Sequence, residues 1–487
     1  HLLLVGSSGS GKSRSVIIPT IDMLALAGEN MFISDVKGEL YLYTAPKLKE
    51  LGYNVIAIDY IQFLKSNCYN YLDVVINAVN DDNISLAESL INDLVNIIVE
   101  KNDKTEPIWK NGEMSVIKTA IMSVVLENKE NREYQTLANA YYFIAEMFRT
   151  NKDGTMLIDK YMQEKEANNP IKKFFAISSV APVRTRGSFV SAGLSTMQMF
   201  VDDYVATNTS KSDFDLRTFA KEKTAIYVLL PDDKDTYHKL ASLLVQQLYT
   251  VLVQTSRDQG GELGIRMNFI FDEFANFTKI DSFQSMLTVS RGRNIRFLIC
   301  VQSFSQIEER YGKEGAQNIL NNCALMYLKS SDNDTALKVS DKLGTYTVQS
   351  YGESSNSNIK YDNSSSSMSL ISRKLLTQDE VQRIESPYVL VMIAGKPPAI
   401  CNIPDISQMH FNKLNGMGNQ IENQALRIAR ENERKTRKVT PIKIWDVWKK
   451  YLEKQENVVQ RSIQNNLRVR EGEGNNEIKK GKNEESN

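Results

Sequence analysis

The sequence is poor in histidine and cysteine. Only three histidines occur among its 487 residues, which argues against a metal site built on histidine ligands. The four cysteines, Cys68, Cys300, Cys323 and Cys401, lie far apart and form no CxxC pair. This spacing argues against a disulfide framework and against a zinc site, and it suits a reducing compartment.

The chain also lacks net charge and long apolar runs. Lys and Arg number 59 and so do Asp and Glu, so any surface that binds nucleic acid has to be local. No apolar run approaches the roughly 20 residues that span a bilayer, and no signal peptide is visible. The length predicts two or three folded units. There is no initiator Met and the chain starts in an apolar strand, so we expect a fragment whose natural N-terminus has been removed.

Short apolar runs predict a mostly parallel α/β sheet that an all-helical insertion interrupts. Apolar residues recur at helical spacing from Ala87 to Ile98, and strand signals are nearly absent until about residue 222. We therefore expect a first part of the sheet domain over 1–81, an all-α domain over 82–215 and the rest of the sheet domain over 216–409. The predicted strands are 2–5, 31–35, 53–59, 224–230, 267–271, 296–301, 324–328 and 388–393.

Two polar regions differ from this pattern. Serine and asparagine dominate residues 351–369, which predicts a mobile surface loop. Residues 410–487 are predicted to form a polar C-terminal tail, with one amphipathic helix over 442–451 and disorder over 470–487. Basic residues gather across 427–438, so we interpret the tail as a partner-binding segment, with a plain solvated end as the alternative.

A glycine-rich segment follows the first predicted strand. Residues 6–13, GSSGSGKS, match the phosphate-binding pattern GxxxxGK[ST] and open a helix. Glycines let the backbone N–H groups point at phosphates, and the helix N-terminus favours negative charge. The segment predicts binding of ATP and Mg²⁺, with Lys12 on the β- and γ-phosphates and Ser13 on Mg²⁺; the alternative is a Gly/Ser turn that happens to contain lysine. The predicted nucleotide-binding residues are Gly6, Ser7, Ser8, Gly9, Ser10, Gly11, Lys12, Ser13 and Arg14.

A second acidic site follows the predicted strand 267–271. Asp272 is predicted to hold Mg²⁺ with Ser13, and Glu273 to polarise the attacking water. A strand followed by two acidic residues is by itself weak evidence for a catalytic site, because acidic residues often follow strands. Together with the phosphate-binding segment it predicts a P-loop ATP hydrolase, and a glutamate in the second position favours active hydrolysis.

Three further side chains are candidates for catalysis. Gln302 follows the strand 296–301 and is predicted to sense the γ-phosphate or the lytic water; the alternative is an exposed amide at a strand end. Arg291 and Arg293 flank Gly292, and either one is predicted to act on a neighbouring subunit as an arginine finger. The alternative for the pair is a solvated basic turn.

Residues 34–40, SDVKGEL, resemble the DPKGE(L) signature of the TraG/TraD-type coupling proteins of conjugation and type IV secretion. Val36 stands where the family usually has proline, while Asp35, Lys37, Gly38 and Glu39 are kept. The resemblance covers roughly residues 1–405. Further stretches similar to the family follow in matching order at 56–59, 69–70, 271–274, 301–303 and 376–381.

This resemblance implies a RecA-like nucleotide domain that an all-α, substrate-recognising domain interrupts. It also implies a hexameric ring with ATP between subunits, and a membrane anchor of N-terminal helices that this chain lacks. We therefore expect the cytosolic portion of a protein held at the cytoplasmic face of the bacterial membrane. The implied partners are DNA with its relaxase, or protein substrates, and the subunits of the secretion channel.

Alternatives remain both for the roles of single residues and for the function of the whole chain. Asp35 and Glu39 fit a purely structural role, capping and orienting the second strand–helix unit. The whole chain also fits a DNA translocase of the chromosome-segregation type, or a substrate receptor in which ATP only locks the oligomer. Such a translocase should lack the large helical insertion, and Glu273 argues against a receptor without hydrolysis.

Overall fold

The computed structural model describes residues 1–99, 106–150, 154–233, 236–358 and 361–452. They form two compact units. The sheet unit comprises His1–Asn67 and Asp213–Lys438, and the helical unit comprises Cys68–Ser212 with the segment that begins at Val439. The chain of the helical unit from Cys68 to Ser212 is thus inserted within the sheet unit.

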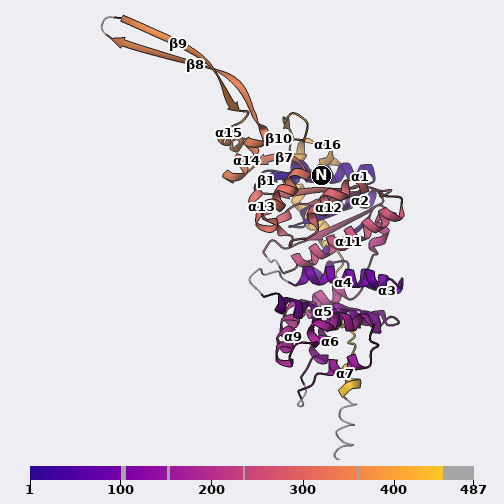
Figure 1. Ribbon diagram of the computed structural model, residues 1–487. Helices are drawn as coiled ribbons and strands as arrows, with labels where there is room; N and C mark the ends of the chain where they lie inside the picture. Colours follow the sequence, from indigo (N-terminus) through magenta and orange to yellow (C-terminus); the bar gives the residue numbers. More distant parts are fainter. Residues whose placement is uncertain (100–105, 151–153, 234–235, 359–360, 453–487) are drawn as a thin grey trace, which may run out of the picture. The chain divides into compact units, whose positions relative to one another are not determined.

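A nine-stranded sheet forms the centre of the sheet unit (Figure 1), with the strand order β11-β10-β7-β1-β6-β5-β2-β4-β3. The seven strands from β7 to β3 run parallel, while β10 and β11 are antiparallel to their neighbours. The predicted α/β class with a parallel-rich sheet is therefore confirmed, and β11 is the strand that the sequence did not predict. The strands are Leu2–Gly6 (β1), Asn30–Asp35 (β2), Asn54–Asp59 (β3), Thr224–Leu229 (β4), Met267–Phe271 (β5), Ile295–Val301 (β6), Ala324–Lys329 (β7), Tyr388–Met392 (β10) and Ala399–Asn402 (β11).

Alternate strand residues point to opposite faces of the sheet, and each face is covered. On one face Phe269 stacks on Phe297, and Phe283 of helix α12 packs against Phe297. On the other face Ile270 belongs to an apolar core that includes residues of α1 and α2. The helices of the sheet unit are Ile18–Ala27 (α1), Glu39–Glu50 (α2), His238–Asp258 (α11), Phe283–Ser290 (α12), Phe304–Asn322 (α13), Asn333–Leu343 (α14), Gln378–Gln382 (α15), His410–Leu414 (α16) and Gln420–Glu433 (α17).

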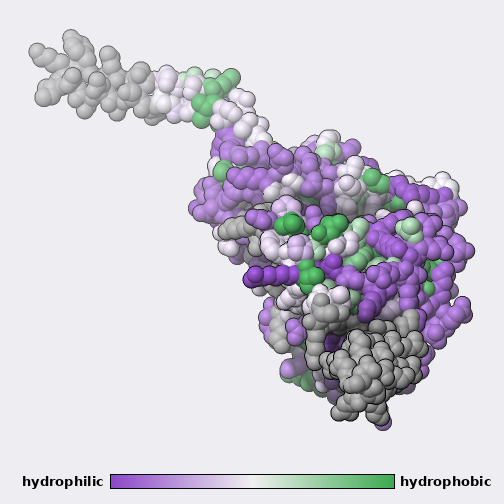
Figure 2. Space-filling view, turned by 60° about the horizontal axis from the view of Figure 1, so that its bottom comes forward, coloured by the Kyte–Doolittle hydropathy of each residue, from purple (hydrophilic) through white to green (hydrophobic). Residues whose placement is uncertain are grey.

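The predicted loop over 351–369 is wrong, because the chain there forms an antiparallel hairpin. Its strands, Thr345–Asn358 (β8) and Tyr361–Lys374 (β9), pair throughout and leave the central sheet in Figure 1. Figure 2 shows apolar side chains on this arm. Met368 and Leu370 of β9 are more than 60 % exposed. Serine and asparagine mark the segment as polar, but a polar strand exposed on both faces has no apolar alternation to reveal it.

The helical unit packs around α5, whose buried side chains include Val116, Ile117 and Ile121. In the described part of this unit, the only β-pairing is an isolated bridge between Thr150 and Met156. Its helices are Asp73–Asn80 (α3), Ile84–Ile98 (α4), Pro107–Glu127 (α5), Leu137–Met147 (α6), Leu157–Gln163 (α7), Pro170–Ser179 (α8), Val183–Met197 (α9) and Asp203–Thr209 (α10).

The unit boundaries differ from the predicted ones. The helical unit begins at Cys68 rather than at 82, because α3 packs on α4 and α5 instead of on the sheet. It ends at Ser212, close to the predicted 215. The spacing of apolar residues located the helices but did not show which unit α3 would join.

The predicted tail also divides between the two units. Residues up to Lys438 belong to the sheet unit, and the following residues belong to the helical unit, where Trp445 stacks on Phe143. Residues 441–446 lie outside any helix, so the predicted helix over 442–451 is wrong in its first half. The predicted disorder over 470–487 lies outside the described residues.

Candidate functional site

The phosphate-binding segment forms a tight loop between β1 and the helix that follows it. Gly9 and Gly11 have φ of 74° and 85°, a region that favours glycine. A Cβ on Gly6 would collide with Ser10 Oγ and the Lys12 side chain. The Lys12 ammonium donates hydrogen bonds to the carbonyls of Gly6 and Ser7. The Lys12 side chain therefore folds back over the backbone of the loop. Phosphate binding requires this arrangement.

Parallel strands bring distant residues to this loop. β1 lies beside β6, β6 beside β5 and β5 beside β2, so their carboxyl ends share one edge of the sheet. The polar residues at these strand ends meet there, although they lie far apart in the sequence. The predicted site is therefore assembled by sheet topology rather than by local sequence.

Ser13 and Asp272 are neighbours at this edge. Ser13 Oγ donates to Asp272 Oδ1 at 3.4 Å. Burial raises the pKa of the Asp272 carboxyl above its ordinary value, and the charge of Lys12 opposes this rise. A hydroxyl beside a carboxylate is a pair of hard oxygen donors, which is the ligand type that Mg²⁺ prefers.

Glu273 lies beside Gln302 at the end of β6. Gln302 Nε2 donates to Glu273 Oε2 at 3.0 Å. The other oxygen, Oε1, is buried and has no hydrogen-bond partner among the described residues. Burial raises the pKa of Glu273, while the bond from Gln302 lowers it. A buried carboxylate oxygen without a partner is costly in a folded protein, and such groups mark functional sites.

Ser34 and Asp35, the first residues of the SDVKGEL segment, lie beside Asp272. Ser34 Oγ accepts the Asp272 backbone N–H at 3.0 Å, and Asp35 accepts the Tyr41 N–H at 2.8 Å. Burial raises the pKa of Asp35 to about 7, and the neighbouring charge of Asp272 adds to the rise. Asp35 thus orders the turn into α2, as its structural alternative proposes, and it lies close enough to Asp272 for the charges of the two carboxyl groups to oppose each other.

Two residues of the C-terminal segment reach this region, and the sequence did not reveal them. Asp405 accepts two hydrogen bonds from Arg14, both at 2.7 Å. Arg427 of α17 pairs with Glu39 at 3.2 Å. Arg14 is therefore held by a carboxylate, whereas the sequence predicts that it binds the nucleotide. The basic composition of 427–438 indicated binding, but nothing in it pointed to Glu39.

The two candidate arginine fingers lie elsewhere. Arg291 and Arg293 precede β6, so they lie at its amino end, whereas Gln302 follows its carboxyl end. Arg291 is exposed, and Arg293 Nη1 donates to the Val289 carbonyl at 3.2 Å. Within one chain the structure brings together Lys12, Ser13, Asp272, Glu273 and Gln302, and leaves both arginines out.

A family model described as type IV secretory system conjugative DNA transfer matches residues 1–426. The chain belongs to this family. It is 24 % identical over 404 residues to protein VirD4 of Rhizobium radiobacter, covering 82 % of this chain and 56 % of VirD4. It is also 24 % identical over 409 residues to the conjugal transfer protein TraG of Escherichia coli, covering 80 % of this chain and 62 % of TraG. The chain thus spans little more than half the length of such relatives.

Solved structures of the conjugative coupling protein TrwB share the fold. The unbound form aligns with a TM-score of 0.63 at 17 % identity, covering 84 % of this family member and 85 % of the TrwB chain. TrwB has also been solved in complex with ADP and Mg²⁺, and that structure aligns with a TM-score of 0.60 at 16 % identity, covering 86 % of this chain and 88 % of TrwB. Within the described residues of this family member, no helix combines the length and apolar character needed to cross a membrane.

Proposed function

We propose that this chain is a Mg²⁺-dependent ATPase that couples ATP hydrolysis to substrate delivery in a conjugative type IV secretion machine. The grouping of Ser13 of the phosphate-binding loop with Asp272 and Glu273 after β5 and with Gln302 after β6 carries this proposal. Membership of the conjugative DNA transfer family supports the coupling role.

The residues present fit ATP and Mg²⁺. The glycines of the loop let its backbone curl as phosphate binding requires, and Lys12 adds a positive charge there. Ser13 and Asp272 would hold Mg²⁺, which when bound neutralises part of the phosphate charge. The TrwB complex with ADP and Mg²⁺ supports the same assignment.

Glu273 and Gln302 would act on the attacking water. The Oε1 atom of Glu273 is available to accept a proton, because Gln302 already occupies Oε2. Burial raises the pKa of Glu273, which makes the carboxylate a better base than an exposed one. Gln302 would orient Glu273 and report on the state of the site.

The wider role follows from the family. The proposed partners are a relaxase–DNA complex or protein substrates, the secretion-channel subunits, and further copies of this chain in a hexameric ring. The proposed setting is the cytoplasmic face of the bacterial membrane, and the helical unit is the proposed receptor for substrate. Arg291 or Arg293 would complete the site of a neighbouring subunit, because both lie at the opposite edge of the sheet.

Steady-state ATP hydrolysis, with and without single- and double-stranded DNA, tests the proposal against the Lys12→Ala variant. We expect turnover that rises with protein concentration and with DNA, and that disappears in the variant, because Lys12 supplies the charge that holds the phosphates. Tight ATP binding without turnover under every condition would instead favour a nucleotide-gated receptor. Normal turnover by Lys12→Ala would refute the assignment of the site.

A further inference from the structure

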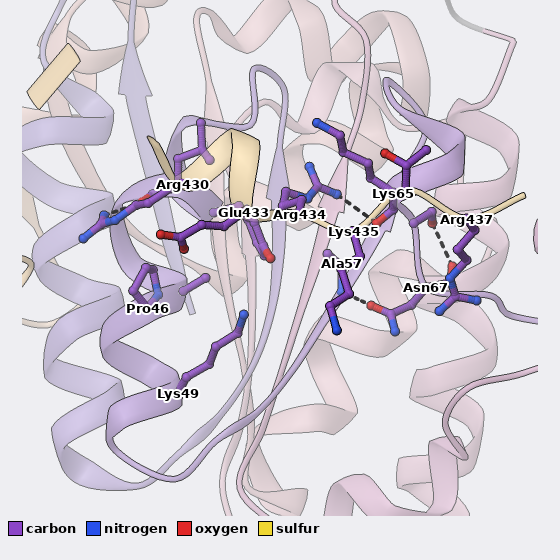
Figure 3. A pocket seen from close by; sticks show the side chains of 15 residues that line it. Pro46, Lys49, Ala57, Lys65, Asn67, Arg430, Glu433, Arg434, Lys435 and Arg437 are labelled. Atoms are coloured by element: carbon purple, nitrogen blue, oxygen red, sulfur yellow. Dashed lines mark hydrogen bonds between the residues drawn. The ribbon is translucent and has the colours of Figure 1, made fainter. Parts of the chain in front are cut away.

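A cleft lies in the sheet unit apart from the phosphate-binding loop. It has a volume of about 640 Å³ and lies between α2, the end of β3 with the loop after it, and the segment from Arg430 to Arg437 (Figure 3). None of its lining residues belongs to the loop 6–14. The volume falls within the range of pockets that hold small ligands.

The lining is strongly basic. Six lining side chains carry a positive charge and one, Glu433, carries a negative charge. The basic lining residues are Lys49, Lys65, Arg430, Arg434, Lys435 and Arg437. A concave surface of one sign concentrates the electrostatic field and attracts ions of the opposite sign.

Three of these cations already have carboxylate partners. Lys65 pairs with Glu431 at 2.9 Å, Arg434 with Asp59 at 2.7 Å, and Arg437 with Asp213 at 2.6 Å. These pairs hold the walls of the cleft together and contribute little net charge. They also occupy the guanidinium groups of Arg434 and Arg437.

The other three cations have no ion-pair partner among the described residues. Arg430 donates to the carbonyls of Leu42, Tyr43 and Asn415, which satisfy its N–H groups, and the negative charges of Glu433 and Glu50 act on it without forming an ion pair. Burial lowers the pKa of Arg430. Lys49 and Lys435 are exposed at the cleft, and Figure 3 shows Lys49 reaching from α2 toward its middle. The single negative charge of Glu433 does not balance these cations, so the cleft keeps an excess of positive charge.

The chemistry of the three cations without an ion-pair partner favours a phosphate ligand over a carboxylate ligand. A guanidinium group recognises a planar carboxylate through two parallel hydrogen bonds, but every arginine in the cleft is already engaged. The uncommitted groups are two lysines on different walls, and an ammonium group binds phosphate as a point charge. Asn67 also lines the cleft and adds an amide.

We propose that the cleft between α2 and residues 430–437 binds phosphate groups through Lys49 and Lys435, while the positive charge of Arg430 adds to the attraction. The site is separate from the ATP site, and its occupancy does not depend on hydrolysis. A nucleic-acid strand as the source of the phosphates would rest on the proposed function, whereas a free phosphate or pyrophosphate would not.

The test compares Lys49→Gln/Lys435→Gln with Lys313→Gln/Lys396→Gln, which removes the same charge from exposed lysines outside the cleft. Both pairs are exposed, so neither change should affect folding. The probes are a fluorescein-labelled single-stranded oligodeoxynucleotide and inorganic pyrophosphate, with a saturating non-hydrolysable ATP analogue and Mg²⁺ present to occupy the phosphate-binding loop. The affinity for the analogue is measured separately.

We expect the cleft variant to bind at least one probe about tenfold more weakly, and the control variant to bind like the wild type. With the oligodeoxynucleotide, the slope of log affinity against log salt should fall by about 0.7 for each lysine removed. Weaker binding of the oligodeoxynucleotide alone identifies strand phosphates, and weaker binding of pyrophosphate identifies a free anion.

Equal binding of both probes by the cleft variant and the wild type would overturn the proposal, as would an equal loss in the control variant or no binding by the wild type. Failure to bind the ATP analogue would contradict the proposed function instead. The comparison of the two lysine pairs would still report on the cleft in that case.

Discussion

Asp272 and Glu273 follow one another in the sequence, but their carboxyl groups have different partners. Asp272 lies beside the Ser13 hydroxyl and near the charge of Lys12, whereas Glu273 is bound on one oxygen by Gln302. Successive residues leave a strand in different directions, so two adjacent acids can serve two tasks. The proposed division into a metal ligand and a base follows from these contacts.

The Glu273→Gln variant tests the proposed base. The amide keeps the size of the side chain and can still accept the bond from Gln302, but it cannot take a proton. We expect ATP binding to be retained and kcat to fall by about 10²–10⁴-fold. Single-turnover hydrolysis and nucleotide binding would be measured beside Glu262→Gln, which changes an exposed acid before β5. Rapid hydrolysis by Glu273→Gln would place the base elsewhere.

Asp35 predicts a pH dependence of stability. Its pKa of about 7 in the folded chain lies above the ordinary value of 3.8, so the folded state holds the proton to higher pH. The stability that Asp35 contributes is therefore fully present below its unfolded pKa and is lost as the pH rises through about 7.

The Asp35→Asn variant cannot titrate in this range. Its free energy of unfolding relative to the wild type should therefore rise between about pH 5 and about pH 8, by about 3 kcal/mol at most. Urea unfolding across this range measures the difference, with Asp258→Asn as the exposed control. A difference that stays constant with pH would mean that Asp35 titrates normally in the folded chain.

At the scale of elements, the segment from Asp405 to Arg437 connects parts of the sheet unit that β-pairing leaves separate. It reaches the phosphate-binding loop through Asp405 and α2 through Arg427 and Arg430. It reaches the end of β3 through Arg434. Charge pairs thus fix the segment together with Ile406 and Met417, which belong to the apolar core. The sequence predicts a partner-binding tail from residue 410, and its composition does not show these contacts within the chain.

The pair of Arg434 with Asp59 predicts a large effect on stability. The two side chains are 8 % and 1 % exposed. Removing one partner leaves a buried charge, so Arg434→Gln should lower the free energy of unfolding by about 3 kcal/mol. The backbone N–H groups of Ile61 and Gln62 still bind Asp59. The cost should therefore lie at the lower end of the range for a broken buried ion pair.

The matched control is Arg217→Gln, which breaks the pair with Asp215. These side chains are 55 % and 40 % exposed, so the change should cost less than about 1 kcal/mol. Denaturant unfolding of both variants gives the comparison. Equal costs would show that the Arg434 pair is not buried in solution.

At the scale of the whole molecule, the chain passes from the sheet unit into the helical unit after Asn67 and returns before Asp213. Arg437 holds these two places together, because its N–H binds the Leu64 carbonyl and its guanidinium binds Asp213. The sheet unit therefore brings the ends of the insertion near each other. A short flexible linker in place of Cys68–Ser212 should leave the sheet intact.

This arrangement predicts the result of excising the helical unit. A chain in which a Gly/Ser linker replaces Cys68–Ser212 and which ends at Lys438 should bind a non-hydrolysable ATP analogue with unchanged affinity. It should lose binding of the cognate substrate, because the helical unit is the proposed receptor. Calorimetry with the analogue and co-sedimentation with substrate measure the two properties.

The control keeps the helical unit but also ends at Lys438, which removes the stacking of Trp445 on Phe143 and destabilises that unit alone. Cognate substrate that still docks to the excised chain would show that the receptor lies in the sheet unit.

Much of the fold and part of the site could be predicted because they rest on local patterns. Eight short apolar runs coincide with strands of the sheet, since a strand buried on both faces must be apolar along its length. The phosphate-binding loop and the acids after β5 were likewise visible as short motifs. The hairpin β8–β9 was missed because its polar residues carry no such pattern.

The sequence alone determined the strands, the glycine turn and the residue types at the strand ends, because each depends on neighbours within a few positions. Only the tertiary structure decided which distant groups meet. It paired Arg14 with Asp405 and Glu39 with Arg427, joined α3 to the helical unit, and placed Arg291 and Arg293 at the edge opposite Gln302. These outcomes depend on strand order and on charge pairs across hundreds of residues, and no local pattern encodes either.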